Sequence, residues 1–64
     1  MCLSTIIKVV NGKDEGAICD NIRQVSVDGT RLTFIDIIGS EYQVDGKISN
    51  VDLIDNKIFV DMAE

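Results

Sequence analysis

The stretch that decides the fold is IRQVSVDGTRLTFIDI, residues 22–37. Apolar and polar residues largely alternate on both sides of Asp28-Gly29, and this period of two is typical of β-strands. An Asp-Gly pair between two such runs is a strong hairpin signal, because a tight hairpin turn needs residues that tolerate positive φ angles. The stretch therefore predicts two antiparallel strands, near 22–27 and 30–37, joined at Asp28-Gly29.

The rest of the chain repeats this pattern of short apolar segments and turn residues. We expect further strands near residues 3–10, 41–45, 47–54 and 57–62, with a short piece at 17–20. We expect turns at Asn11-Gly12, Gly16, Gly39-Ser40-Glu41, Asp45-Gly46 and Asp55-Asn56. A meander of five to seven short antiparallel strands predicts an all-β fold, a small SH3/Sm-like barrel, because closure removes exposed strand edges. Residues 1–64 are expected to form this single domain.

The alternation also predicts which side chains fill the interior of the barrel. These are Leu3, Ile7, Val9, Val25, Val27, Leu32, Phe34, Val44, Ile48, Val51, Leu53, Ile58, Val60 and Met62. Further apolar residues face the opposite way, namely Ile6, Ile35, Ile37, Ile54 and Phe59. A barrel cannot bury both faces of its strands, and exposed apolar patches mark interfaces. Since a chain of 64 residues also has a small core, we expect a homodimer.

Composition argues against two classes of partner. A net charge of −5, singly scattered basic residues and three aromatic residues in all are unsuited to nucleic acid, which binds through clustered Lys and Arg and stacking rings. No apolar run approaches the roughly 20 residues of a membrane span, and no secretory signal pattern is visible. We therefore expect a cytoplasmic protein, in which Cys2 and Cys19 stay reduced.

The first five residues, MCLST, raise the possibility of a metal site at Cys2, although the chain has no histidine. If Met1 is trimmed, the Cys2 thiolate and α-amine form a five-membered chelate. If Met1 is retained, its amine, the Cys2 amide nitrogen and the Cys2 sulfur form two such rings. Mixed nitrogen and sulfur donors in a plane suit Ni(II) or Cu(II). One chain supplies at most half of a square, so a two-fold dimer would complete the site.

Two other interpretations of Cys2 compete with metal binding. An N-terminal cysteine can be a catalytic nucleophile with its own amine as base, but this chain has no room for the oxyanion hole and layered fold of such enzymes. We therefore expect no enzymatic activity. Cys2 can also be a small packing residue at the start of an edge strand, since free cysteine packs like a hydrophobe. From position alone, the packing interpretation is favoured.

Other residues with candidate chemistry have simpler structural explanations. Cys19 has no CxxC or Cys/His spacing and is expected to be a buried structural thiol. Asp52, between Val51 and Leu53, is expected to face solvent or to accept backbone hydrogen bonds at a corner. Arg23 and Asp36 have no distinguishing context. The chain has no EF-hand loop, no P-loop and no dinucleotide fingerprint.

Four segments together resemble a known family. They are Met1-Cys2-Leu3-Ser4, Ile22-x-x-Val25-x-x-Asp28-Gly29, Ile37-Ile38-Gly39-x-Glu41 and Gly46-x-Ile48-x-x-Val51-Asp52-Leu53-x-x-x-x-Ile58. This pattern resembles the CooT family of small nickel-binding proteins, which are linked to maturation of the nickel site of carbon monoxide dehydrogenase. The most specific part is the Met-Cys start combined with the Gly-x-Ile-x-x-Val-Asp-Leu segment.

The resemblance implies a compact β-barrel homodimer in which Cys2 of each subunit holds one Ni(II), with nitrogen from the N-terminus or nearby backbone. It makes metal binding the favoured interpretation of Cys2. The expected role is nickel delivery or maturation of a nickel enzyme such as carbon monoxide dehydrogenase, with a nickel enzyme or nickel-insertion protein as partner. The alternative is a small β-barrel interaction or RNA-binding module in which Cys2 is structural.

Overall fold

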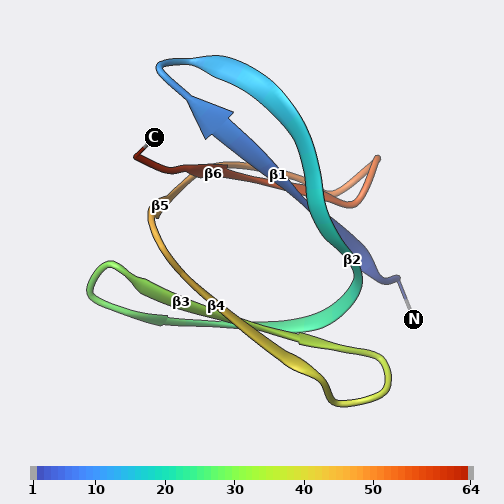
Figure 1. Ribbon diagram of the computed structural model, residues 1–64. Helices are drawn as coiled ribbons and strands as arrows, with labels where there is room; N and C mark the ends of the chain where they lie inside the picture. Colours follow the sequence, from blue (N-terminus) through green and yellow to red (C-terminus); the bar gives the residue numbers. More distant parts are fainter. Residues whose placement is uncertain (1, 64) are drawn as a thin grey trace.

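A computed structural model describes residues 2–63 as a single curled sheet (Figure 1). Its strands are β1 (Ser4–Val10), β2 (Lys13–Asp28), β3 (Arg31–Asp36), β4 (Glu41–Asp45), β5 (Lys47–Asp52) and β6 (Lys57–Asp61). The predicted all-β class is confirmed. Among residues 2–63 there is no helix that is long and apolar enough to cross a membrane.

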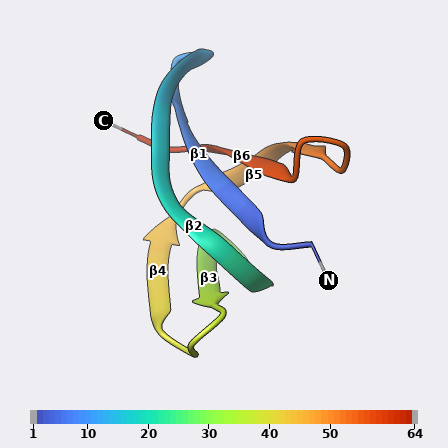
Figure 2. The ribbon, with the colours of Figure 1, turned by 90° about the vertical axis from the view of Figure 1, so that its right-hand side faces the viewer.

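The six strands follow the order β4-β3-β2-β1-β6-β5 across the sheet. Strand β2 curves through the molecule, so that β3 and β4 lie on the other side of the interior from β5 and β6 (Figures 1 and 2). The sheet begins at β4 and ends at β5, which do not pair with each other within the described chain. The predicted barrel is therefore only partly correct, because the sheet curls like a barrel wall without closing. The homodimer stays a prediction.

Strand β2 joins two segments that we expected to be separate. It runs without interruption for 16 residues, from Lys13 to Asp28, and pairs with β1 and then with β3. Its register shifts against both neighbours, and Asn21 has a φ of 56° near the middle of the strand. Such irregularities bend a strand and increase its twist. From the sequence, the residues around this bend look like a turn between two strands. In the structure they form a bend within one continuous strand.

The hairpin predicted at Asp28-Gly29 is confirmed. Asp28 pairs with Arg31, and the ladder continues to the pair Val25 and Phe34. Gly29 adopts a φ of 61°, which is a conformation that glycine enters without steric cost.

One pairing departs from an antiparallel meander. Strand β1 pairs with β6 in parallel, from Thr5 opposite Lys57 to Val9 opposite Asp61. The curl of the sheet brings the last strand back beside the first one, where it covers the edge of β1 that β2 leaves free. The prediction of exclusively antiparallel strands was wrong at this point, because local alternation carries no information about pairing between distant segments.

The core lies on the concave side of the sheet. Its buried apolar side chains are Ile6, Ile7, Val10, Ile22, Leu32, Phe34 and Val60. Half-buried residues packed against them include Val25, Val44, Ile48, Ile58 and Met62. The predicted core is confirmed at Ile7, Leu32, Phe34 and Val60 and at these half-buried positions, while Leu3 and Val9 are also half-buried.

The predicted core was wrong at six positions. Val27, Val51 and Leu53 are exposed, whereas Ile6, Val10 and Ile22 are buried. Ile6 and Ile7 are neighbours in sequence yet both buried, because the register of β1 against β2 shifts between them. Of the other residues expected on the opposite face, Ile37 and Ile54 are exposed, and Ile35 and Phe59 are half-buried.

Candidate metal centre at Cys2

Cys2 lies two residues before the first residue of β1 and is an exposed, free thiol. The strand that follows lies between β2 and β6 and is therefore not an edge of the sheet. The packing interpretation placed Cys2, as a small apolar residue, at the start of an edge strand. The exposed side chain and the central position of β1 do not fit that interpretation.

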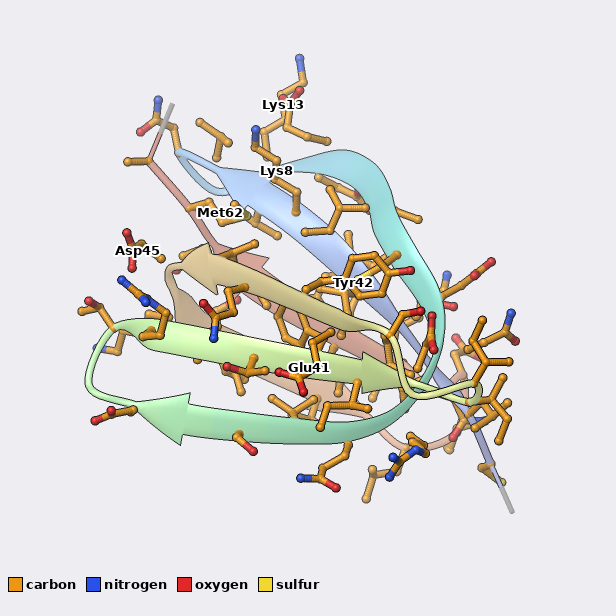
Figure 3. All side chains as sticks on the ribbon, turned by 60° about the horizontal axis from the view of Figure 1, so that its bottom comes forward. Lys8, Lys13, Glu41, Tyr42, Asp45 and Met62 are labelled. Carbon is orange, nitrogen blue, oxygen red and sulfur yellow. The ribbon has the colours of Figure 1, made fainter. Side chains whose placement is uncertain are left out.

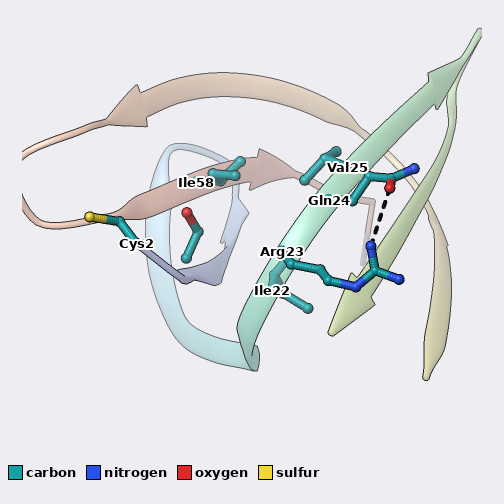
Figure 4. A pocket seen from close by; sticks show the side chains of 7 residues that line it. Cys2, Ile22, Arg23, Gln24, Val25 and Ile58 are labelled. Atoms are coloured by element: carbon teal, nitrogen blue, oxygen red, sulfur yellow. Dashed lines mark hydrogen bonds between the residues drawn. The ribbon is translucent and has the colours of Figure 1, made fainter. Parts of the chain in front are cut away.

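Cys2 lines a hollow of about 190 Å³ at the N-terminal end of β1 (Figure 4). The other residues around it are Ser4, Ile22, Arg23, Gln24, Val25 and Ile58. They come together because two residues of β1 pair with the neighbouring strands. Ser4 pairs with Ile22 on β2, and Ile6 pairs with Ile58 on β6. Isoleucine and valine make part of its wall apolar, and Arg23 and Gln24 supply the polar side. The sulfur of Cys2 lies on the side of the hollow away from Arg23 (Figure 4).

Arg23 is engaged in hydrogen bonds beside this hollow. Its Nε donates to the carbonyl oxygen of Asp36 across 3.2 Å, and a terminal nitrogen donates to Gln24 Oε1 across 3.5 Å. A guanidinium has no free lone pair and cannot be a metal ligand. Arg23 therefore connects the wall of the hollow to β3 and contributes a positive charge, but no donor atom for a metal.

The donor set available to a metal within one chain is small. Within residues 2–63 no group of three or more Cys, Asp or Glu side chains is arranged to hold a metal ion. The two predicted chelate arrangements depend on Met1, which lies outside the described residues. A thiolate sulfur is a soft ligand that suits thiophilic transition metals, and the Cys2 side chain is accessible to one. The described chain therefore offers one accessible soft donor at Cys2 and no complete set of ligands.

Cys19 is not among the residues that line the hollow at Cys2. It pairs with Ile6 within the β1–β2 ladder and packs half-buried against the core. Burial, and then the neighbouring charges of Asp20 and Asp36, raise the pKa of the Cys19 thiol. A protonated, partly enclosed thiol is a poor ligand and a poor nucleophile. This agrees with a structural role for Cys19, although the residue is half-buried and not fully enclosed.

Asp36, at the end of β3, is a buried residue whose importance the sequence did not reveal. It is 8% exposed. Its Oδ1 accepts hydrogen bonds from the backbone N–H groups of Ser40 and Ile38, across 2.9 and 3.1 Å, and its Oδ2 accepts one from the Tyr42 hydroxyl. A signal was present in Asp36-Ile37-Ile38-Gly39-Ser40, since aspartate before a glycine-containing turn commonly bonds to the backbone ahead of it.

The pKa of Asp36 follows from these contacts. Burial alone raises it, but the hydrogen bonds from Ser40, Tyr42 and Ile38 outweigh burial and hold the pKa below its ordinary value. The same hydrogen bond raises the pKa of Tyr42, because the phenol gives up its proton less readily beside a carboxylate. Tyr42 extends from β4 toward the bend of β2 (Figure 3).

Asp52 occupies a similar position at the end of β5. Its Oδ1 accepts hydrogen bonds from the backbone N–H groups of Ile54 and Asp55, across 3.0 and 2.9 Å. The expectation that Asp52 accepts backbone hydrogen bonds is confirmed. Asp36 and Asp52 therefore each hold one turn, and both turns carry exposed apolar side chains.

Comparison with known proteins extends these observations. The model of the family described as "CO dehydrogenase accessory protein CooT" matches residues 1–61. The fold is similar to the crystal structure of a CooT candidate from Carboxydothermus hydrogenoformans, with a TM-score of 0.83 and 17% sequence identity, covering 98% of this chain and 100% of that chain. No curated protein matches the sequence. Because the family model spans nearly the whole chain and includes Cys2, this chain belongs to the CooT family.

Proposed function

We propose that this protein binds one Ni(II) ion per homodimer through Cys2 of each subunit and acts in the delivery of nickel to carbon monoxide dehydrogenase or in the maturation of that enzyme. The family match over residues 1–61 carries the proposal, since the family is described as a carbon monoxide dehydrogenase accessory protein. The exposed, free thiol of Cys2 supports it.

The donor chemistry favours a dimeric site. Each chain offers one sulfur, with main-chain nitrogen next to it, and a square-planar Ni(II) centre takes four such donors. Two copies related by two-fold symmetry supply a complete set. The absence of histidine from the chain argues against storage of many ions, which relies on histidine-rich tracts.

An exposed site suits transfer of the ion to another protein. A metal held at Cys2 would lie at the surface, where a ligand of the acceptor can replace a ligand of the donor without unfolding of the sheet. The ion is then the cargo, and the role of this protein is accessory and not catalytic. The acceptor is a nickel enzyme or a nickel-insertion protein that handles its metal.

Nickel binding is tested by titrating the reduced, full-length protein with Ni(II) while following thiolate-to-nickel absorption and native mass. We expect saturation at one ion per two chains, loss of binding in Cys2→Ser, and unchanged binding in Cys19→Ser as the matched control. Apparent affinity should rise with pH, since thiol and nitrogen donors release protons on binding. Equal nickel binding by Cys2→Ser and the unaltered protein would overturn the proposal.

Delivery is tested separately, with nickel-free carbon monoxide dehydrogenase and a chelator that captures free nickel. The nickel-loaded protein should activate the enzyme in the presence of the chelator, whereas Cys2→Ser incubated with the same nickel should not. If the chelator prevents activation of the enzyme equally by free nickel and by the nickel-loaded protein, the delivery role is wrong. That result would leave nickel binding by Cys2 unaffected.

A further inference from the structure

The outer edge of β4 is open in this sheet. Strand β4 pairs with β3 on one side, and within residues 2–63 no strand pairs with its other side. Strand β5 is the second edge of the sheet, but its ladder with β6 is shifted between Ile48 and Asn50. The ladder between β3 and β4 has no such shift from Glu41 to Asp45. Strand β4 is therefore the more regular of the two free edges, and it lies at the outer margin of the lower half of the molecule in Figure 2.

Two hydrogen bonds show which residues of β4 turn their backbone outward. The Asp36 N–H donates to the Ser40 carbonyl oxygen across 3.0 Å. The Gly46 N–H donates to the Thr30 carbonyl oxygen across 2.9 Å. Ser40 and Gly46 thus face β3, and in an antiparallel ladder the residues that face the partner strand alternate with those that face away. The backbone N–H and C=O groups that face away from β3 are consequently those of Glu41, Gln43 and Asp45.

The side chains along this edge are sorted between the two faces of β4. Glu41, Gln43 and Asp45 are exposed and share one face, because side chains alternate along a strand. Tyr42 and Val44 share the opposite face, and Tyr42 projects toward the bend of β2 (Figure 3). A hollow of about 270 Å³, lined in part by Gln43, Val44 and Asp45, opens at one end of the strand. The edge thus offers two carboxylates on one face and two less polar side chains on the other.

A second copy of β4 is a poor occupant of this edge. Antiparallel pairing of two β4 strands over their full length would set Glu41 opposite Asp45 at both ends of the pair. Like charges directly opposite each other destabilise a strand pair, and charged side chains on an edge strand oppose self-pairing. Arg31 Nε lies 3.5 Å from the Asp45 carboxylate, but both side chains are largely exposed, and a surface pair of this kind contributes little. The charges of this edge therefore favour an occupant with basic side chains.

From this arrangement we infer that β4 binds an extended, basic segment of a partner protein as an added strand. Alternate residues of the segment exchange main-chain hydrogen bonds with Glu41, Gln43 and Asp45, a mode of recognition in which the main chain gives affinity and the side chains give specificity. Lys or Arg opposite the two carboxylates stabilises the strand pair, and apolar residues between them extend the face of Tyr42 and Val44. The segment therefore reads basic, apolar, polar, apolar, basic. The net charge of −5 also attracts a basic segment over longer distances.

This edge is separate from the surroundings of Cys2. None of the residues that line the hollow at Cys2 belongs to β4. A strand added at β4 would leave the exposed thiol accessible, so one partner could hold the protein while Cys2 carries out its own chemistry. The inference needs no nickel and stands or falls apart from the proposed metal site.

The test titrates the reduced, full-length protein, without metal, with the capped peptide Lys-Val-Thr-Val-Lys, whose pattern is the same in both strand directions. NMR spectra of isotope-labelled protein should show saturable shifts of the β4 amide signals. Bound peptide should slow amide hydrogen exchange at Glu41, Gln43 and Asp45, whereas exchange at Tyr42 and Val44, whose N–H groups face β3, should stay the same. The peptide Glu-Val-Thr-Val-Glu is the matched control and should not bind.

Variants of the protein test the two parts of the inference. Glu41→Lys should raise the dissociation constant of the basic peptide by roughly fivefold or more. Glu15→Lys makes the same charge change at an exposed position of β2 and should leave the constant nearly unchanged. Gln43→Pro removes the central outward N–H group and should abolish binding, since proline is tolerated on an edge strand where its nitrogen faces solvent. Circular dichroism checks that each variant is folded.

Three results would overturn the inference. The first is equal binding of the basic and acidic peptides, and the second is slowed exchange that does not alternate along β4. The third is slow exchange at Glu41, Gln43 and Asp45 in the free protein that is lost on dilution, because a second copy would then occupy the edge. Since no nickel is added, each of these results leaves the proposed metal site to its own titration.

Discussion

The hydroxyl of Tyr42 on β4 donates a hydrogen bond to Asp36 Oδ2 at the end of β3, across 3.1 Å. The carboxylate also receives the backbone N–H groups of Ile38 and Ser40. One side chain thus connects the edge strand β4 to the turn between β3 and β4. The two ionisable groups shift in opposite directions, with the pKa of Asp36 lowered and that of Tyr42 raised.

Acid should lower the free energy of unfolding of the protein by protonating Asp36. A folded-state pKa below the ordinary value means that Asp36 stabilises the fold above that value, and that this contribution is lost as pH falls through the lowered pKa. Urea unfolding between neutral pH and about pH 2 measures it. Asp36→Asn should lower the free energy of unfolding at neutral pH and flatten its fall in acid. The control Asp61→Asn alters an exposed carboxylate on β6 and should do neither.

Alkali should also lower the free energy of unfolding, in this case by deprotonating Tyr42. The pKa of Tyr42 is shifted upward, opposite to that of Asp36. Because its pKa is raised in the folded state, the hydrogen bond stabilises the fold below the ordinary tyrosine pKa and is lost as pH rises through the raised value. Tyr42 is the sole tyrosine in the chain, so tyrosinate absorbance follows this group directly. Asp36→Asn should move the titration back toward the ordinary value. An unchanged titration would contradict the assignment.

The two cysteines should differ in reactivity toward an alkylating reagent. Cys2 is exposed, whereas Cys19 is half-buried and its pKa is raised, and the thiolate is the nucleophile. Mass spectrometry of the folded protein should find Cys2 modified first, with Cys19 modified at high pH or after unfolding. Cys2→Ser and Cys19→Ser assign the two rates, and equal rates in the folded state would contradict the structure.

Gly46, between β4 and β5, should not tolerate a side chain. Its backbone passes so close to β6 that an added Cβ would lie 2.7 Å from the Asp61 carbonyl oxygen and 2.9 Å from Val60 Cγ1. Gly46→Ala should lower the free energy of unfolding by about 1–3 kcal/mol, as measured by urea unfolding. Lys47→Ala, an exposed change at the next position, is the control and should have little effect.

Asp52 should stabilise the turn at residues 53–54. Asp52→Ala removes the acceptor of two backbone hydrogen bonds, each worth about 0.5–1.5 kcal/mol. We expect faster amide hydrogen exchange at Ile54 and Asp55. Asp52→Asn keeps the acceptor oxygen and should preserve the slow exchange, so equally fast exchange in the Asn and Ala variants would contradict this role.

Local signals predicted most of the strands and turns correctly. Asp28-Gly29 specifies its turn through backbone geometry alone, and the alternation around it needs no distant partner. The parallel pairing of β1 with β6 was missed because it joins segments about 50 residues apart, and alternation does not encode such partners. Alternation also separates two faces without stating which one is inside, so Val27 and Leu53 were placed in the core although they are exposed.

The candidate site was partly visible in the sequence. Cys2 was identified from its residue type and from the presence of the Gly-x-Ile-x-x-Val-Asp-Leu segment in the same chain. Both can be read from the sequence without knowledge of the fold. Asp36 was missed because its burial depends on Tyr42 from the next strand and on the curl of the sheet. The exposure of Ile38 and Leu53 likewise follows from the folded arrangement of their turns and is not encoded in the alternation.

The place of β1 in the sheet has a consequence for biosynthesis. Because β1 needs β6 as its second neighbour, the end that carries Cys2 cannot assemble while the nascent chain still lacks its last strand. Contacts between segments so far apart close late and slowly during folding. A ribosome-bound chain would therefore carry Cys2 on an incomplete sheet, and the surroundings of this thiol would form only after β6, which ends at Asp61, has been synthesised.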